Sequence, residues 1–400
     1  MLLRVLAVVA LVLTISPTYA QSDSSMLIGG DTLTYRYVPV DRIPIGGEPS
    51  DGASGRSILD YLTFGDDDPN PGVSFTVIGS PYYTEERGWG IALAGDMRYR
   101  TKRMSREDSP SLLRLKLSAS LKAYYSAQLM GENWFGGNRH RVRYEASFAS
   151  MPGYVWGLNF SEATAGKRGS YNSENIVVAG SYAHRLASDL MVGVHADYRY
   201  MVTCDLSDYA AKVLSGEVLS LAALGVSVDI EYDARRADAT TTRGLYFVGA
   251  YTLRHYLSGN IPMGHNVTLQ LDYYLPLWRG ATLLFDLYGE YNSAETPWML
   301  RAKLGGDVRM RGYYWGRYIG DNMVATQVEL SQHVWQGLAL AAWGGAGTLF
   351  SHDDSFAWRK VLPTYGLGLR WRLGSEGALK IDVAFGRGSN AVIAGFSGVF

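Results

Sequence analysis

The stretch Leu304-Gly-Gly-Asp-Val-Arg-Met-Arg-Gly-Tyr-Tyr-Trp-Gly-Arg-Tyr318 lies between two segments in which apolar and polar residues alternate. Before it, positions 283, 285, 287 and 291 are apolar or aromatic, while Asp286 and Glu290 take the other parity. After it, the run 324–330 alternates in the same way around Gln327 and Glu329. A two-residue period predicts β-strands with one apolar and one polar face. A long loop between two such strands, with arginine beside glycine, predicts a segment that folds inward to meet charges, as in the lumen of a membrane barrel.

The two-residue period recurs from residue 72 to the carboxy-terminus. A soluble sandwich also alternates, but its strands are usually shorter and share a core between two sheets. Strands of about ten residues are long enough to cross a bilayer at a tilt. We therefore expect an all-β protein, a 16-stranded antiparallel transmembrane β-barrel with an inward-folded extracellular loop. The expected strands are 72–80, 88–101, 110–119, 123–134, 139–151, 175–186, 189–203, 217–233, 244–256, 265–276, 281–293, 322–334, 338–350, 361–373, 378–386 and 392–400.

The composition fits this class and excludes others. A mean hydropathy near zero rules out a bundle of membrane-spanning helices but is what alternating strands give. The 46 glycines suit closely packed, curved strands, and the 28 tyrosines suit a membrane–water interface. Cys204 is the single cysteine, so no internal disulfide stabilises the fold. The net charge of −1 gives no reason to expect a nucleic-acid partner.

The amino-terminal residues predict export. Residues 1–20 combine one positive charge, an apolar run and small residues before Gln21, which is the pattern of a signal peptide. Residues 21–71 are rich in Gly, Ser and Asp, and we expect a periplasmic lead-in with little regular structure. Residues 72–400 form the predicted barrel, and its last residue is the aromatic Phe400.

The connections alternate between short and long, which predicts the topology. Short turns are expected to be periplasmic and long loops extracellular. The long connections lie near 152–174, 204–216 and 294–321. The arginine-glycine-tyrosine stretch is therefore expected to enter the barrel from the outer side.

The sequence from about 70 to 400 resembles the BamA/TamA outer-membrane family (bacterial surface antigen barrels). Its sixth-loop motif is matched by Met310 and then Arg311, Gly312 and Tyr313, with family-like Gly305 and Gly306 before it. A family-like strand end and restart are found at Asp233, Arg235, Arg243 and Gly244. The aromatic carboxy-terminus, Phe400, is typical of the same proteins. The resemblance implies a barrel inserted by the barrel assembly machinery into an outer membrane that contains lipopolysaccharide.

Two departures from the family pattern change what is expected. The family's loop arginine normally meets an aspartate on the strand after the motif strand, but Gly345 stands at that position. A buried guanidinium needs a carboxylate, so Glu329 is the expected partner and Asp382 the second choice, because both have lumen parity. Family members that insert or export proteins also carry periplasmic POTRA modules of about 75 residues, which residues 21–71 cannot hold. A separate periplasmic partner would have to supply such a domain.

No catalytic, metal or cofactor motif is expected. The seven histidines show no metal-helix spacing, and His195 beside Asp197 is the one candidate for a catalytic pair. We therefore expect no enzyme and no cofactor. Two functions remain open: a barrel that assembles or translocates polypeptides, and a closed structural or interaction barrel. Gly395 and Gly398 weaken packing in the last strand, which favours a seam that opens.

Overall fold

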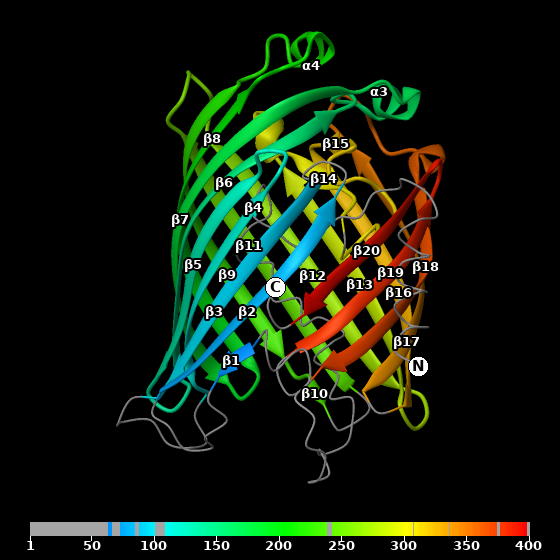
Figure 1. Ribbon diagram of the computed structural model, residues 1–400. Helices are drawn as coiled ribbons and strands as arrows, with labels where there is room; N and C mark the ends of the chain where they lie inside the picture. Colours follow the sequence, from blue (N-terminus) through cyan, green and yellow to red (C-terminus); the bar gives the residue numbers. More distant parts are fainter. Residues whose placement is uncertain are drawn as a thin grey trace.

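The computed structural model describes residues 63–65, 73–84, 88–100, 109–237, 242–306, 308–335, 337–373 and 377–397. Sixteen long antiparallel strands run up and down through this part of the chain and curve into a barrel (Figure 1), which confirms the predicted fold class. They are β2 (Val73–Thr84), β3 (Gly88–Tyr99), β4 (Ser111–Ser120), β5 (Tyr125–Phe135), β6 (His140–Val155), β7 (Gly169–Ala187), β8 (Leu190–Cys204), β9 (Ser220–Asp233), β11 (Thr242–Tyr256), β12 (Gly264–Pro276), β13 (Ala281–Asn292), β16 (Asn322–Trp335), β17 (Leu338–Phe350), β18 (Leu362–Leu373), β19 (Gly377–Gly386) and β20 (Ser389–Ser397).

Each long strand pairs with the next one along the chain, β9 with β11 and β13 with β16. Two shorter strands join the sheet: β1 (Thr63–Gly65) pairs with β2, and β10 (Arg236–Ala237) pairs with β11. β2 and β20 are the first and last of the long strands. Both face the viewer in Figure 1.

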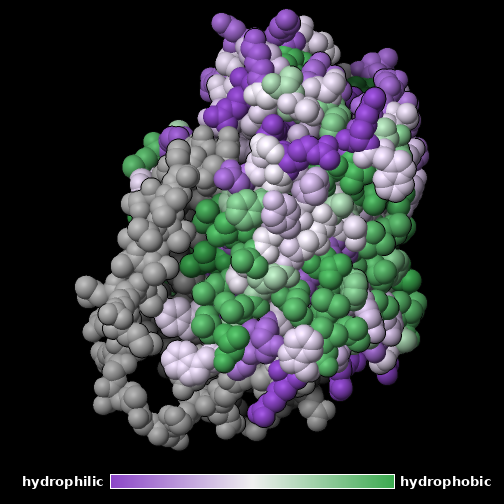
Figure 2. Space-filling model, turned by 90° about the vertical axis from the view of Figure 1, so that its right-hand side faces the viewer, coloured by the Kyte–Doolittle hydropathy of each residue, from purple (hydrophilic) through white to green (hydrophobic). Residues whose placement is uncertain are grey.

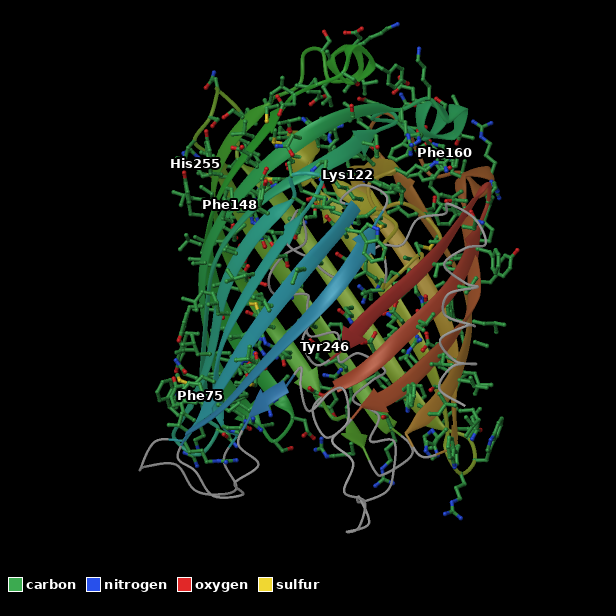
Figure 3. All side chains as sticks on the ribbon, in the orientation of Figure 1. Phe75, Lys122, Phe148, Phe160, Tyr246 and His255 are labelled. Atoms are coloured by element: carbon green, nitrogen blue, oxygen red, sulfur yellow. The ribbon has the colours of Figure 1, made fainter. Side chains whose placement is uncertain are left out.

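The alternation of residues along each strand sets which side chains face outward. In β12, Leu269 is 49% exposed while its neighbour Gln270 is 1% exposed. Figure 3 shows the same contrast between Phe75 and Phe148 on the outer wall and Tyr246 inside the outline of the barrel. Figure 2 shows an apolar band around the middle of one face, with hydrophilic side chains above it and below it. Such a band is what lipid requires of a barrel surface.

Aromatic side chains mark both edges of the apolar band. Tyrosine and tryptophan favour the membrane–water interface because one end of each ring is apolar and the other polar. Exposed rings at the lower end of the barrel are Phe135, Trp278, Trp335 and Trp371. Those at the upper end, which holds the helices, are Trp89, Tyr125, Tyr251 and Tyr291. The band between them defines the part of each strand that spans the membrane.

The long connections predicted near 204–216 and 294–321 lie at one end of the barrel, but length alone does not distinguish the ends, because the two-residue turn between β19 and β20 lies at that end as well. The upper loops hold α3 (Phe160–Ala165), α4 (Asp208–Val213) and the 3-10 helices η3 (Trp298–Leu300) and η4 (Trp358–Lys360). None of these helices was predicted from the sequence, because all are single turns or little more. Asn159 and Ser207 cap α3 and α4 by accepting backbone N–H groups.

No helix in the described ranges is both long and apolar enough to cross a membrane.

Several predicted boundaries were wrong. The loop expected at 152–174 is shorter, because β6 and β7 continue to Val155 and start from Gly169. Pro152 is tolerated inside β6 because pairing with β5 ends at Ser150, so β6 is an edge strand on that side. The last strand begins at Ser389 rather than 392, because a two-residue turn with Gly388 in a left-handed conformation joins it to β19.

Several predictions concern residues outside the described ranges. The signal peptide at 1–20 and Phe400 both lie there, as does Gly398. Of the lead-in at 21–71, the structure describes the three residues of β1.

The two faces of β12 give a direct test of the register. Leu269→Arg places a charge on the lipid face near mid-membrane and is expected to lower the free energy of unfolding by about 2–4 kcal/mol. Gln270→Arg places the same charge in the lumen and is expected to cost far less. Urea unfolding of the protein from lipid vesicles measures both. Equal costs would contradict the register, since a slip of one residue exchanges the two faces.

Candidate functional site

The loop between β13 and β16, residues 293–321, folds into the barrel. A small hairpin gives it structure: β14 (Ala302–Leu304) pairs with β15 (Tyr318–Gly320). Its upper part packs through η3 against wall residues that include Met201 and Tyr256. Its lower part packs against the wall near Tyr288 and Met323 through the buried side chains of Leu304, Met310, Tyr313 and Tyr318. The loop therefore carries its own apolar core into the lumen.

Glycines make the path of this loop sterically allowed. Gly305, Gly306 and Gly312 have φ angles between +100° and +116°. Residues with a side chain rarely adopt this backbone conformation. A Cβ on Gly312 would also lie 3.0 Å from the carbonyl carbon of Phe385 in β19, where the loop touches the wall. The three glycines singled out in the sequence thus lie where the backbone needs them.

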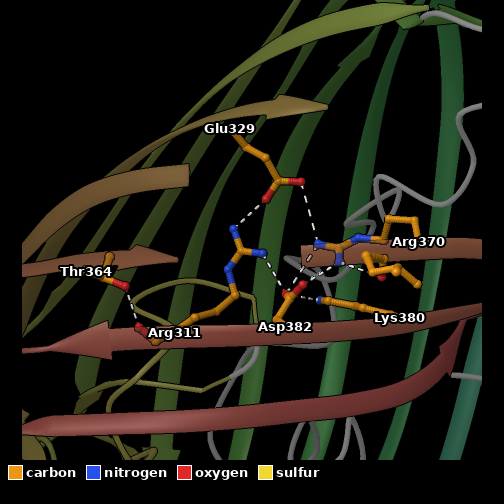
Figure 4. Close-up of polar contacts among 7 residues, drawn as sticks. Arg311, Glu329, Thr364, Arg370, Lys380 and Asp382 are labelled. Atoms are coloured by element: carbon orange, nitrogen blue, oxygen red, sulfur yellow. Dashed lines mark hydrogen bonds and ion pairs between the residues drawn. The ribbon is translucent and has the colours of Figure 1, made fainter. Parts of the chain in front are cut away.

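Arg311 lies at the tip of the loop and is almost completely buried, with 1% of its surface exposed. Its Nη2 donates to Glu329 Oε2 at 2.5 Å, and its Nη1 donates to Asp382 Oδ2 at 2.9 Å (Figure 4). The guanidinium also stacks over Trp343, with Cζ 3.6 Å from the ring centroid. Glu329 comes from β16 and Asp382 from β19, so the arginine ties together strands that are three apart in the sheet.

The two carboxylates are shared with cations from the wall. Arg370 of β18 donates to Asp382 and lies 3.7 Å from Glu329, and Lys380 lies 3.7 Å from Asp382. Three positive groups thus surround two negative ones, all of them buried. Removing one partner from such a group breaks buried ion pairs, which typically costs about 3–5 kcal/mol.

A second arginine of the loop makes a separate anchor. Arg309 donates to both carboxylate oxygens of Asp286 in β13, at 2.9 to 3.1 Å, and its guanidinium lies over the ring of Tyr288. Arg309 was missed in the sequence, although Asp286 had been placed on the lumen parity. Its position two residues before Arg311 was the available signal. The two arginines hold the loop tip to one continuous part of the wall, from β13 through β16 to β19.

Uncharged hydrogen bonds fix the backbone next to Arg311. The Tyr313 hydroxyl donates to the carbonyl of Pro363 at 2.7 Å and accepts from the backbone N–H of Arg387 at 2.6 Å. The Thr364 hydroxyl donates to the carbonyl oxygen of Arg311. These three hydrogen bonds attach the loop tip to β18 and to the start of the turn after β19.

The second family-like motif lies elsewhere, at the end of the barrel with the short turns. Arg235 donates to both oxygens of Asp233 at 2.8 Å and stacks over Tyr246. Burial disfavours the charged form of Arg235, but Asp233 outweighs it and raises the pKa of that guanidinium above its usual value. Gly244 has φ +118°, and a Cβ there would collide with the carbonyl of Ala234. Arg243 is exposed. This motif shapes a strand corner and does not contact the loop tip.

The candidate catalytic pair is part of an ion network in the opposite wall. His195 Nε2 lies 3.5 Å from Asp197 Oδ1, but Asp197 also accepts from Arg199 and Arg254 at 2.9 Å. A carboxylate committed to two guanidiniums cannot hold and orient one histidine as a base. We assign the pair a structural role.

The ion network around Arg311 is testable by a double-mutant cycle. Arg311→Ala is expected to lower the free energy of unfolding by about 3–5 kcal/mol and to open the loop to trypsin. Glu329→Ala is expected to act in the same direction, and the double variant to cost clearly less than the sum, because both changes break one interaction. Urea unfolding and tryptic cleavage in vesicles measure these effects. Lys212→Ala, at an exposed position in α4, is the control.

Strictly additive costs would show that the two residues do not act together. In that case Asp382, which also contacts Arg311, would be paired with Arg311 in a second cycle.

Comparison with known proteins places these features in a family. The model of the Omp85 superfamily domain matches residues 112–396. The outer membrane transporter CdiB of Dickeya dadantii is 26% identical over 257 residues, which are 57% of this chain and 46% of that protein. The chain thus spans less than half the length of this relative.

Two solved structures share the fold. The structure of BamA from Haemophilus ducreyi lacking POTRA domains 1–3 matches with a TM-score of 0.54 and 12% identity, over 80% of this chain and 68% of that one. CdiB from Acinetobacter baumannii matches with a TM-score of 0.55 and 13% identity, over 82% and 59%. Since the family model covers more than two thirds of the sequence, the chain belongs to the Omp85 superfamily and is a β-barrel of the Gram-negative outer membrane.

Proposed function

We propose that this barrel assists the assembly of other polypeptides in the outer membrane, as a protein of the BamA/TamA type. The proposal is supported by the match to the Omp85 superfamily domain over residues 112–396, and by β2 and β20, the first and last long strands, whose outer edges would form the seam of the barrel. In lipid, every unpaired backbone N–H and C=O group costs several kcal/mol, so a free strand edge favours pairing with another strand. An incoming extended polypeptide provides such a strand.

The pinned loop supports this proposal. Arg309 and Arg311 hold the loop in the lumen against β13 and β16–β19, so the wall stays rigid while the sheet ends exchange partners. β1 pairs antiparallel with Thr76–Ile78 of β2, so a client strand would pair with the rest of this edge or displace β1. Assembly at the edge does not require the loop to leave the lumen.

Polypeptide translocation is the second candidate, and the similarity to an outer membrane transporter favours it. Translocation would pass a chain through the lumen, so the loop would have to leave. The ion pairs of Arg309 and Arg311 are reversible contacts that permit such a release. A closed structural barrel, the other function that the sequence left open, needs neither a free edge nor a movable loop.

The remaining features are part of the same proposal. We propose that residues 1–20 direct export, that 21–71 form a periplasmic lead-in and that 72–400 form the barrel. The barrel assembly machinery would insert the protein, and a separate periplasmic partner would supply any module that receives the substrate. No catalytic step or cofactor is proposed.

Refolding of a client protein tests the proposed function. The barrel in lipid vesicles is mixed with a urea-unfolded eight-stranded outer-membrane protein, and client folding is followed by its heat-modifiable mobility on gels. We expect at least severalfold faster folding than in empty vesicles. An unchanged rate of client folding would contradict the assembly function and favour a closed structural barrel.

A reversible lock on the loop separates assembly from translocation. In a Cys204→Ser background, Met310→Cys with Gly347→Cys should form a disulfide, since a Cβ at 347 would lie 3.1 Å from Met310 Cγ. Assembly at the sheet edge predicts unchanged client folding when the lock is oxidised. Loss of activity on oxidation and recovery on reduction would favour translocation instead. Ser227→Cys with Thr252→Cys, which links two neighbouring strands at side chains that already face each other, is the matched control.

A further inference from the structure

Two arginines face each other at the end of the barrel with the short turns. Arg236 in β10 and Arg243 in β11 are direct cross-strand partners, and both are exposed. Like charges directly opposite one another on a sheet destabilise it. Asp189 contacts Arg236 at 2.6 Å, whereas Arg243 makes no ion pair within the described residues. An external anion between the two guanidinium groups would lessen their repulsion.

The next hairpins along the sheet add a third arginine and two tryptophans. The turn between β12 and β13 carries Trp278 and the exposed Arg279, and the tip of β16 carries Trp335. The hairpins are joined, because Trp278 Nε1 donates to Gln332 Oε1 at 2.6 Å. We call Arg236, Arg243, Arg279, Trp278 and Trp335 the collar. Its strands are consecutive in the sheet, from β11 through β12 and β13 to β16.

The collar lies where the surface of a membrane would meet the barrel. Trp278 and Trp335 are 58% and 56% exposed, at the lower edge of the apolar band. Arg243 has the parity opposite to that of the buried Thr242, so it points out of the barrel and not into the lumen. Figure 1 shows β10 at the foot of the barrel, the end assigned to the periplasm.

We propose that the collar binds the head group of an anionic phospholipid in the periplasmic leaflet of the outer membrane. The phosphodiester oxygens would accept hydrogen bonds from Arg243 and Arg279, a geometry that guanidinium groups favour. The indoles of Trp278 and Trp335 would stand at head-group level, and the acyl chains would lie along the apolar face above. The anion would also relieve the repulsion between Arg236 and Arg243.

A lipid fits the collar better than an acidic protein does. Trp278 and Trp335 are exposed beside the exposed Arg279, and such rings favour the head-group level of a membrane, whereas an acidic protein would not require them. Basic residues at a membrane surface attract anionic lipid with about a fivefold gain in affinity each. Binding is therefore expected to weaken as salt is raised.

Native mass spectrometry of the full chain in detergent tests the assignment. Phosphatidylglycerol and phosphatidylcholine of equal chain length are the two probes. We expect tighter binding of phosphatidylglycerol, and a roughly fivefold loss with Arg243→Gln and again with Arg279→Gln, while phosphatidylcholine binding stays unchanged. Arg359→Gln, at an exposed position in η4 at the opposite end of the barrel, is the matched control and should have no effect. Heat-modifiable mobility confirms that each variant is folded.

Three results would overturn the proposal: equal binding of the two lipids, the same loss with Arg359→Gln, or phosphatidylglycerol binding that survives loss of both arginines. The same barrel binding a purified acidic periplasmic protein through Arg243 and Arg279, without a preference for phosphatidylglycerol, would assign the collar to a protein partner.

Discussion

A buried guanidinium in the lumen is the constraint on which the rest of this structure depends. Arg311 is removed from water by the loop that carries it, so it has to be paired, and the nearest carboxylates are on β16 and β19. Those carboxylates must in turn be compensated, which Arg370 and Lys380 do. One inward-folded loop therefore accounts for the buried charges of three strands, β16, β18 and β19.

Glycines on the wall make room for these charges. Three buried or half-buried lumen carboxylates each stand directly opposite a glycine of the neighbouring strand: Asp382 opposite Gly368, Asp197 opposite Gly225 and Asp229 opposite Gly193. A Cβ on any of these glycines would collide with the carboxylate beside it. The missing side chains let Arg254 reach Asp197 across β9 and let Arg370 reach Asp382. The abundance of glycine in the sequence thus serves ion pairing across strands as well as curvature.

Local alternation was enough to predict the 16 strands and the lumen parity of Glu329 and Asp382. It ranked Glu329 above Asp382 as the partner of Arg311, whereas Arg311 contacts both, because the curvature of the sheet brings β16 and β19 to one loop tip. The pairing of Arg309 with Asp286 escaped prediction for the same reason. The lengths of β6 and β7 depended on where β5 stops pairing, which no local pattern encodes. Short capped helices such as α3 gave no periodic signal.

Single-channel conductance in planar bilayers tests most directly whether the loop closes the lumen. The wild-type barrel is compared with a variant that lacks residues 294–321, each refolded and checked for heat-modifiable mobility. We expect small, flickering currents from the wild type and a large, steady current from the deletion variant, because the lumen is then filled only with water. Large, steady currents of equal size from both proteins would contradict a loop held inside the barrel by Arg311.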